Sequence, residues 1–152
     1  MKISIASDHA GIHHKEYITE EFLTLEKYEV IDFGCHDTHP VDYVDIGLPA
    51  VESVAEGKSD IAILICGSGQ GMNIIANKVK GIRAALCFNT EFAQLARDHN
   101  NANVLCLPAR FISFGTAMDI IEVFLKTPFS EKESHTNRVR KITEYENFKK
   151  DK

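Results

Sequence analysis

The feature that most constrains the fold is an apolar run that ends in a cysteine and a glycine-rich turn. The run Ile61–Ile65 is apolar on both faces, which is typical of a strand buried inside a parallel sheet. Cys66 closes this run, and Gly67, Gly69 and Gly71 follow it. Open α/β sheets bind ligands beyond the carboxyl ends of their strands. The sequence therefore predicts a thiol at the ligand-binding edge of a sheet.

The spacing of these glycines matches neither of two common nucleotide-binding loops. In the dinucleotide pattern G-x-G-x-x-G the third glycine would come one residue later, and the phosphate-loop pattern needs a lysine that is missing here. We interpret the turn as a small nest of backbone N–H groups that binds an oxyanion. The structural alternative is a tight strand-to-helix turn beside a core cysteine, and residue type and spacing alone favour it.

Strand-like and helix-like segments alternate along the whole chain. Strands are predicted over residues 2–7, 29–33, 61–66, 82–87 and 104–107. The helices between and after them are predicted from apolar residues at helical spacing: Ile18, Phe22 and Leu25; Ile46, Ala50, Val51 and Val54; a segment from about 72 to 79; Phe92, Leu95 and Ala96, with Thr90 as the cap; and Met118, Ile121 and Leu125. Five βα units predict one α/β domain, residues 1–152, with a parallel sheet and helices on both faces.

The segment 131–152 follows a complete set of βα units and therefore has no strand to cover. It is charged and predicted to be helical, with apolar residues at positions 139, 142, 145 and 148. Such a stripe can dock on a partner subunit or pack on its own domain, and the sequence leaves both open.

Composition excludes several classes of function. A net charge of −5 and the absence of a basic run argue against a nucleic-acid partner. No apolar stretch is long enough to span a bilayer, and the N-terminus enters a strand directly, without a signal peptide. The four cysteines form no C-x-x-C pair, which is typical of reduced thiols in a cytoplasmic protein.

Titratable residues follow several of the predicted strands at one edge of the sheet. Asp8 and His9 come after the first strand, Cys66 after the third and Arg110 after the fifth. Because the carboxyl ends of parallel strands share an edge, we expect these four side chains to converge on one cleft.

The remaining histidines are less informative. His99 lies between a helix and the strand that follows it, at the opposite edge, so within one subunit we expect it to be a solvated residue at a helix C-terminus. His36 and His39 lie on a loop, and two histidines without further ligands do not make a metal site.

Several motifs together resemble the type B ribose-5-phosphate isomerases, whose wider family includes galactose-6-phosphate and allose-6-phosphate isomerases. The motifs are Ser7-Asp-His-Ala-Gly11, Leu64-Ile-Cys-Gly-Ser-Gly-Gln-Gly71, Ala76-Asn-Lys78, Gly81-Ile-Arg-Ala84 and Arg97-Asp-His-Asn-Asn-Ala-Asn-Val104. The resemblance covers essentially the whole chain. It implies a flavodoxin-like three-layer α/β/α sandwich with a five-stranded parallel sheet and an extra C-terminal helix. It also implies an aldose–ketose isomerase that acts on a phosphorylated sugar without a metal or cofactor, as a homodimer that is often paired into a tetramer.

The resemblance further assigns roles to individual residues. Cys66 resembles the base that moves a proton between C1 and C2 of the sugar. Ser68, where relatives usually have threonine, should assist that transfer or bind a substrate oxygen. The N–H groups from Gly67 through Ser68, Gly69, Gln70 and Gly71 resemble the nest for the enediolate oxygen.

A second group of residues resembles the ring-opening and phosphate-binding parts of the family's site. His99, supplied by the partner subunit, and Asp8 resemble the pair that opens the furanose ring. The substrate-binding residues of the resemblance are His9, Asn100, Arg110 and the phosphate-binding Arg138.

The chain departs from the family before Arg138, where many members carry a second arginine and this chain has Ser134-His135. We expect His135, Lys132 or Arg140 to help bind the phosphate. The departure leaves the sugar open between ribose and an allose, galactose or tetrose phosphate, although the motifs favour ribose. A non-catalytic flavodoxin-like binding module is the alternative of a different class.

Overall fold

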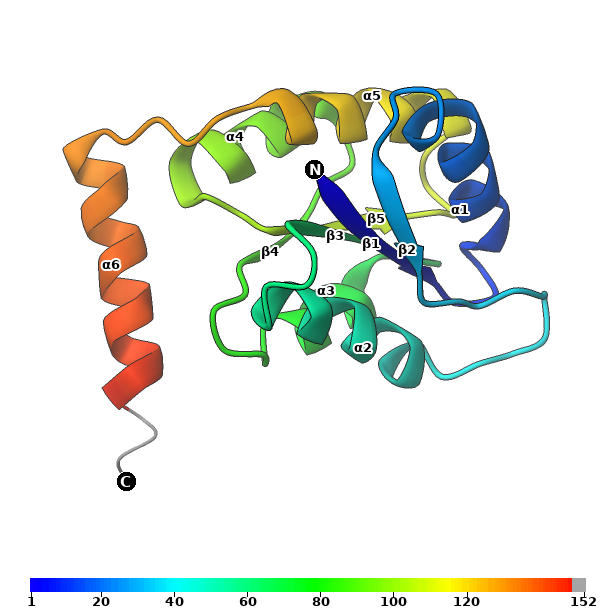
Figure 1. Ribbon diagram of the computed structural model, residues 1–152, viewed down its shortest axis with the longest axis horizontal. Coiled ribbons are helices and arrows are strands. Elements are labelled where there is room, and N and C mark those ends of the chain that lie inside the picture. The colour runs from blue at the N-terminus through cyan, green and yellow to red at the C-terminus, as the bar shows by residue number, and fades with distance from the viewer. Residues whose placement is uncertain (149–152) are drawn as a thin grey trace.

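A computed structural model of the chain describes residues 1–148 and shows a single five-stranded parallel sheet (Figure 1). The strands are β1 (Lys2–Ser7), β2 (Glu29–Asp32), β3 (Ile61–Cys66), β4 (Ala84–Leu86) and β5 (Val104–Pro108). All four neighbouring pairs are parallel, in the order β2-β1-β3-β5-β4.

Helices cover both faces of this sheet, so the predicted three-layer α/β/α sandwich is confirmed (Figure 1). One face carries α1 (Ile12–Ile18) with its π-helical continuation η1 (Thr19–Leu23), α4 (Thr90–Asn100) and α5 (Phe114–Lys126). The other face carries α2 (Tyr43–Ala55) and α3 (Gln70–Ala76). The extra helix α6 (Glu133–Phe148) stands beside the β4 end of the sheet.

The alternation of side chains along β3 divides the core in two. Ile61, Ile63 and Ile65 pack under α1, α4 and α5, whereas Leu64 and Cys66 pack against α2 and α3. A fully buried aliphatic side chain stabilises a fold by about 1.5–3 kcal/mol. Because β3 is buried at every position, it is the rigid centre from which the glycine-rich turn leaves the sheet.

The strand order places β5 directly beside β3. The flavodoxin order 2-1-3-4-5 would put the fourth strand there instead. Cys66 pairs with Pro108 in the ladder between β3 and β5, so the residues that follow these two strands are neighbours. The order thus brings Arg110 next to Cys66.

Three details of the predicted helices are wrong. Leu25 is 68% exposed, because the first helix widens into η1 and ends at Leu23. On α4, Phe92 and Leu95 face solvent and small alanines pack on the sheet instead. The cap of α4 is Asn89, whose side chain accepts a hydrogen bond from the Phe92 N–H at 2.9 Å, and Thr90 is already helical.

The boundaries of two predicted segments also shift. Strand β4 is shorter than the predicted 82–87, since the Arg83 N–H bonds the Asn103 side chain at 2.8 Å rather than a neighbouring strand. Helix α3 begins two residues earlier than expected and ends three residues earlier, at Ala76.

Most of the apolar stripe of α6 is exposed in the described part of the chain. Val139 is half-buried, while Ile142, Tyr145 and Phe148 are exposed. The predicted end of the helix, 149–152, lies outside the described residues. Within residues 1–148, every helix is either too short or too polar to cross a membrane.

Candidate active site

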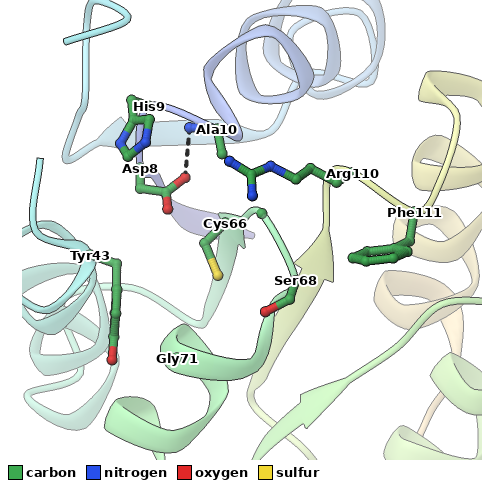
Figure 2. A pocket seen from close by; sticks show the side chains of 10 residues that line it. Asp8, His9, Ala10, Tyr43, Cys66, Ser68, Gly71, Arg110 and Phe111 are labelled. Atoms are coloured by element: carbon green, nitrogen blue, oxygen red, sulfur yellow. Dashed lines mark hydrogen bonds between the residues drawn. The ribbon is translucent and has the colours of Figure 1, made fainter. Parts of the chain in front are cut away.

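A cavity of 330 Å³ opens at the carboxyl edge of the sheet, between the loops that follow β1, β3 and β5 (Figure 2). Its lining is formed by Asp8, His9, Ala10, Tyr43, Cys66, Gly67, Ser68, Gly71, Arg110 and Phe111. The four side chains expected to converge, Asp8, His9, Cys66 and Arg110, are therefore brought together. The volume is at the lower end of the range for small-molecule sites, which suits a small and polar ligand.

Backbone hydrogen bonds hold the thiol and the arginine in register. The Cys66 carbonyl accepts from the Ala109 N–H at 2.9 Å, and the Gly67 carbonyl accepts from the Arg110 N–H at 3.0 Å. The Cys66 side chain is only 4% exposed and lines the cavity. The Arg110 side chain passes over Gly67 so closely that a Cβ at Gly67 would lie 3.2 Å from the arginine Nε. Cation and thiol thus share one small space (Figure 2).

Asp8 has a structural task as well as a place in the cavity. Its Oδ1 accepts hydrogen bonds from the Ala10 N–H at 2.9 Å and the Gly11 N–H at 3.2 Å, which fixes the turn into α1. The second carboxylate oxygen is left to face the cavity (Figure 2). Beside it, His9 Nδ1 accepts a long hydrogen bond from the Val41 N–H at 3.4 Å, so a neutral His9 ring keeps Nε2 as its donor.

The glycine-rich turn has a backbone conformation that requires glycine and leaves N–H groups without a partner among the described residues. Gly69 has φ of +72°, and a Cβ there would lie 2.4 Å from Leu86 Cδ1, so only glycine fits without strain. Ser68 Oγ accepts from the Gln70 N–H at 3.3 Å. Within residues 1–148, no hydrogen bond engages the N–H groups of Ser68 and Gly69. Gln70 lines a second, more apolar hollow beyond Ser68 rather than the main cavity.

The other thiols are in less favourable surroundings for chemistry. Burial raises the pKa of Cys87 to about 12. Burial also raises the pKa of Cys106 well above its usual value, and the neighbouring Cys66 and Cys87 add to the effect. Neither side chain lines the main cavity, so Cys66 is the thiol placed to react there.

Four of the predicted site residues lie away from this edge of the sheet: His99, Asn100, His135 and Arg138. His99 and Asn100 end α4, at the edge where β5 begins, whereas Cys66 lies where β3 and β5 end. The length of β5 alone separates these edges by roughly 13 Å, at about 3.3 Å per residue. Arg138 is exposed on α6, and His135 packs against His99. One subunit therefore does not bring His99 to its own Cys66, as the sequence predicted.

Sequence reasoning missed two side chains of the cavity, Tyr43 and Phe111. Tyr43 begins α2, directly after the Asp42 cap, and its ring is so close to Gly71 that a Cβ there would lie 2.5 Å from it. The loop before α2 reaches the same edge of the sheet, and following it past residue 39 would have revealed Tyr43. Phe111 directly follows Arg110 and is exposed at the cavity rim.

The loop histidines do not gather further ligands. His39 Nδ1 lies 3.1 Å from Asp37 Oδ1, and both side chains are exposed. Within the described part of the chain, no group of three or more His, Cys, Asp or Glu side chains is placed to hold a metal ion.

The chain is similar to sugar-phosphate isomerases over nearly its whole length. Residues 3–142 match the family model described as ribose/galactose isomerase. The structure of ribose-5-phosphate isomerase B from Clostridium thermocellum has 48% identity and a TM-score of 0.93, covering 97% of this chain and 98% of that one. The Mycoplasma genitalium enzyme, solved with bound ribulose-5-phosphate, has 40% identity and a TM-score of 0.91, covering 96% of both chains.

A relative named for another sugar is also similar. The galactose-6-phosphate isomerase subunit LacB of Clostridium acetobutylicum is 37% identical over 144 residues, which are 95% of this chain and 83% of that protein. Together with the shared fold and the thiol-containing cavity, these matches show that the chain belongs to the ribose/galactose isomerase family.

Proposed function

We propose that this chain is an aldose–ketose isomerase that interconverts ribose 5-phosphate and ribulose 5-phosphate without a metal. The observation that carries the proposal is the cavity, in which the Cys66 thiol, a glycine-rich turn with free N–H groups and the Arg110 guanidinium meet. Isomerisation needs a base beside a carbon acid and donors for the oxyanion that develops. All three parts are within this cavity.

In the proposed mechanism, Cys66 alone moves the carbon-bound proton between C2 and C1. In the aldose-to-ketose direction, the thiolate of Cys66 takes the proton from C2, and the electron pair moves through the C1–C2 bond onto O1. The resulting enediolate is stabilised by the N–H groups of the turn. The thiol then returns the proton to C1, while the O2 hydroxyl proton passes to O1 by way of Ser68 Oγ. No atom or electron is gained or lost.

Opening the furanose ring requires residues from two subunits in this proposal. His99 and Asn100 lie at the opposite edge from their own Cys66, and Arg138 lies on α6. A homodimer that brings the partner's α4 end to the cavity would place His99 opposite the Asp8 carboxylate. His9 and Arg110 would bind the sugar from one subunit, and Asn100 and Arg138 from the other. Residues 1–152 would then form one domain, whose segment 131–152 extends toward the partner.

Exposed apolar side chains near the cavity support such a dimer. The rings of Phe88 and Phe92 are in contact, with centroids 4.6 Å apart and 37° between their planes. Both side chains are exposed, as are Leu95 and Phe111. The uncovered stripe of α6 provides further apolar area. Exposed apolar side chains in such numbers are typical of surfaces that bind another protein. A pairing of two dimers into a tetramer is compatible with it.

The preferred sugar is proposed to be ribose, in line with the identity to type B ribose-5-phosphate isomerases. The test is a coupled assay of ribose, allose, galactose and erythrose phosphates in EDTA. The parent protein should isomerise ribose 5-phosphate fastest. Cys66→Ala should lower kcat about a hundredfold or more, the scale of a lost general base.

Four outcomes of this assay would contradict the proposal. A faster hexose or tetrose phosphate would reassign the substrate. Loss of the parent's activity in EDTA would contradict the metal-free chemistry, and near-parent turnover by Cys66→Ala would remove the thiol as base. No isomerisation of any sugar would leave the binding-module alternative.

A further inference from the structure

Helix α6 packs against the body of the protein through a buried side chain in its first turn. His135, in its first turn, is 8% exposed and is the buried residue of the described part of this helix. Farther along, the Glu146 carboxylate accepts a hydrogen bond from the Gly81 N–H at 3.2 Å. Figure 1 shows the rest of α6 standing clear of the sheet. The first turn is therefore where a buried side chain holds the helix against the body of the protein.

A set of hydrogen bonds connects His135 to the end of α4. The side chains of Ser130 and His135 share a hydrogen bond, with Oγ 2.7 Å from Nδ1. The N–H of Ser130 donates to the Asp98 carbonyl at 3.1 Å. The N–H of His135 donates to the Lys132 carbonyl at 2.9 Å, which closes the turn into α6. The ring thus has a fixed orientation relative to α4.

That ring packs on the imidazole of His99. The two ring centroids are 4.2 Å apart, with 36° between the ring planes. On its edge, His99 Nε2 lies 3.3 Å from the Asp98 carboxylate. Within residues 1–148, Nδ1 of His99 has no hydrogen-bond partner. His99 is therefore held on one face and one edge, and Nδ1 is the nitrogen left to act on a bound molecule.

We propose that His135 is a positioning residue for His99: its ring fixes the imidazole that the partner's cavity receives. The proposal rests on the proposed role of His99 in ring opening. This role differs from the sequence-based expectation that His135 binds substrate. His135 is poorly suited to bind substrate because its Nδ1 already shares a hydrogen bond with Ser130 and its side chain is nearly inaccessible.

The charge state of His135 agrees with a packing role. Burial lowers the pKa of His135, and the nearby His99, Lys132 and Arg138 lower it further. The Asp98 carboxylate has the opposite effect and raises this pKa, but it does not reverse the shift. A neutral ring packs on His99 without repulsion between like charges. A neutral ring also contributes little to binding a phosphate dianion, which is better served by a cation.

The test compares four single variants in steady-state kinetics. His135→Ala removes the ring, His135→Phe keeps a ring and removes the Ser130 bond, Ser130→Ala removes only the bond, and Lys141→Ala is a matched control at an exposed site on the same helix. Misplacing a catalytic group by about 1 Å can cost on the order of a hundredfold. We expect kcat to fall about tenfold to a hundredfold in His135→Ala, with KM within about twofold. His135→Phe should recover most of that loss, and Lys141→Ala should match the parent.

A second readout does not depend on activity. The His99 ring signals in a histidine NMR spectrum, assigned with His99→Asn, carry the ring-current shift of the stacked neighbour. This shift should disappear in His135→Ala and persist in His135→Phe. If His135→Ala folds poorly, Ser130→Ala and His135→Phe carry the test. Both keep a ring against His99, so both should keep the ring-current shift and most of kcat, and loss of either in both variants would contradict the inference.

Four results would overturn the inference. A rise in KM with unchanged kcat would make His135 a substrate ligand. Equal losses in the Ala and Phe variants would exclude a role for the ring, as would parent-like kinetics in both. Unmoved His99 signals in His135→Ala would exclude the contact itself. Failure of the proposed function is a separate result, because it would appear as near-parent activity in Cys66→Ala or His99→Asn.

Discussion

Replacing Gly67 by alanine should damage the site while leaving the fold intact. A Cβ at this position would lie 3.2 Å from Arg110 Nε, 3.3 Å from Cζ and 3.4 Å from Cδ. These contacts are tight but not prohibitive, so the guanidinium should move by a few tenths of an ångström. The backbone at Gly67 has no positive φ, so the free energy of unfolding should change by no more than about 1 kcal/mol.

The catalytic cost should be larger than the cost in stability. If the displaced guanidinium loses its charge-assisted hydrogen bond to the substrate, the loss is about 1.5–3 kcal/mol. That corresponds to roughly tenfold to a hundredfold in kcat/KM. The assay is ribose 5-phosphate isomerisation, with urea unfolding measured in parallel. Gly115→Ala is the matched control, because its Cβ would meet no heavy atom nearer than Ser113 Oγ at 4.0 Å.

A double-variant cycle decides whether the loss passes through Arg110. In an Arg110→Ala background, Gly67→Ala should have almost no further effect, because residues that act through one interaction are not additive. The same loss in both backgrounds would show that the new methyl group acts directly on the substrate or the N–H nest. Marked unfolding of Gly67→Ala would show that the backbone at Gly67 does not accept a side chain.

Three further predictions follow from the charges and thiols. In native protein at pH 8, iodoacetamide should label Cys66 ahead of Cys87, because burial raises the pKa of Cys87 to about 12, and substrate should protect Cys66 from labelling. Peptide mass spectrometry measures both effects. Preferential labelling of Cys87 would contradict the assignment of Cys66 as the reactive thiol. Arg138→Ala should lower kcat/KM by about a hundredfold, at the upper end for a lost charge-assisted bond, while Ser134→Arg should lower KM for sugar phosphates and leave the binding of unphosphorylated ribose unchanged. The pKa of His135 is lowered from 6.5 in the folded protein, so protonation of this ring opposes folding. The stability that the neutral ring contributes is therefore present above about pH 6.5 and is lost as the pH falls below that value. Hydrogen exchange in the first turn of α6, corrected for its intrinsic pH dependence, should rise on acidification in the parent and not in His135→Phe. The charged and titratable groups facing that ring are His99, Asp98, Lys132 and Arg138.

The sheet and the main part of the site could be predicted because strong local signals coincide with a general rule. The uninterrupted apolar run of β3 identifies the central strand, and the rule for carboxyl edges is enough to place Asp8, Cys66 and Arg110 together. What the sequence alone did not provide was the neighbour order of β4 and β5, which depends on long-range packing rather than on local periodicity.

Other errors came from surfaces that periodicity describes poorly. Phe92 and Leu95 have the spacing of a core face, yet they face solvent, where the proposal places a second subunit. A single chain's pattern does not distinguish a buried core from a subunit interface, because both are apolar. The contact between the rings of His135 and His99 joins residues 36 positions apart. Sequence motifs describe short spacings and therefore do not predict such a contact.

In the proposed dimer, each cleft combines Cys66 of one subunit with His99 of another. The most direct measurement mixes inactive Cys66→Ala with inactive His99→Asn protein under conditions of verified subunit exchange. Random pairing at equal amounts makes half of the dimers mixed, and each mixed dimer has one intact cleft of its two, so about a quarter of all clefts should be intact. We expect recovery of about a quarter of the parent activity. No recovery after exchange would show that the two residues act within one chain and would contradict the shared cleft.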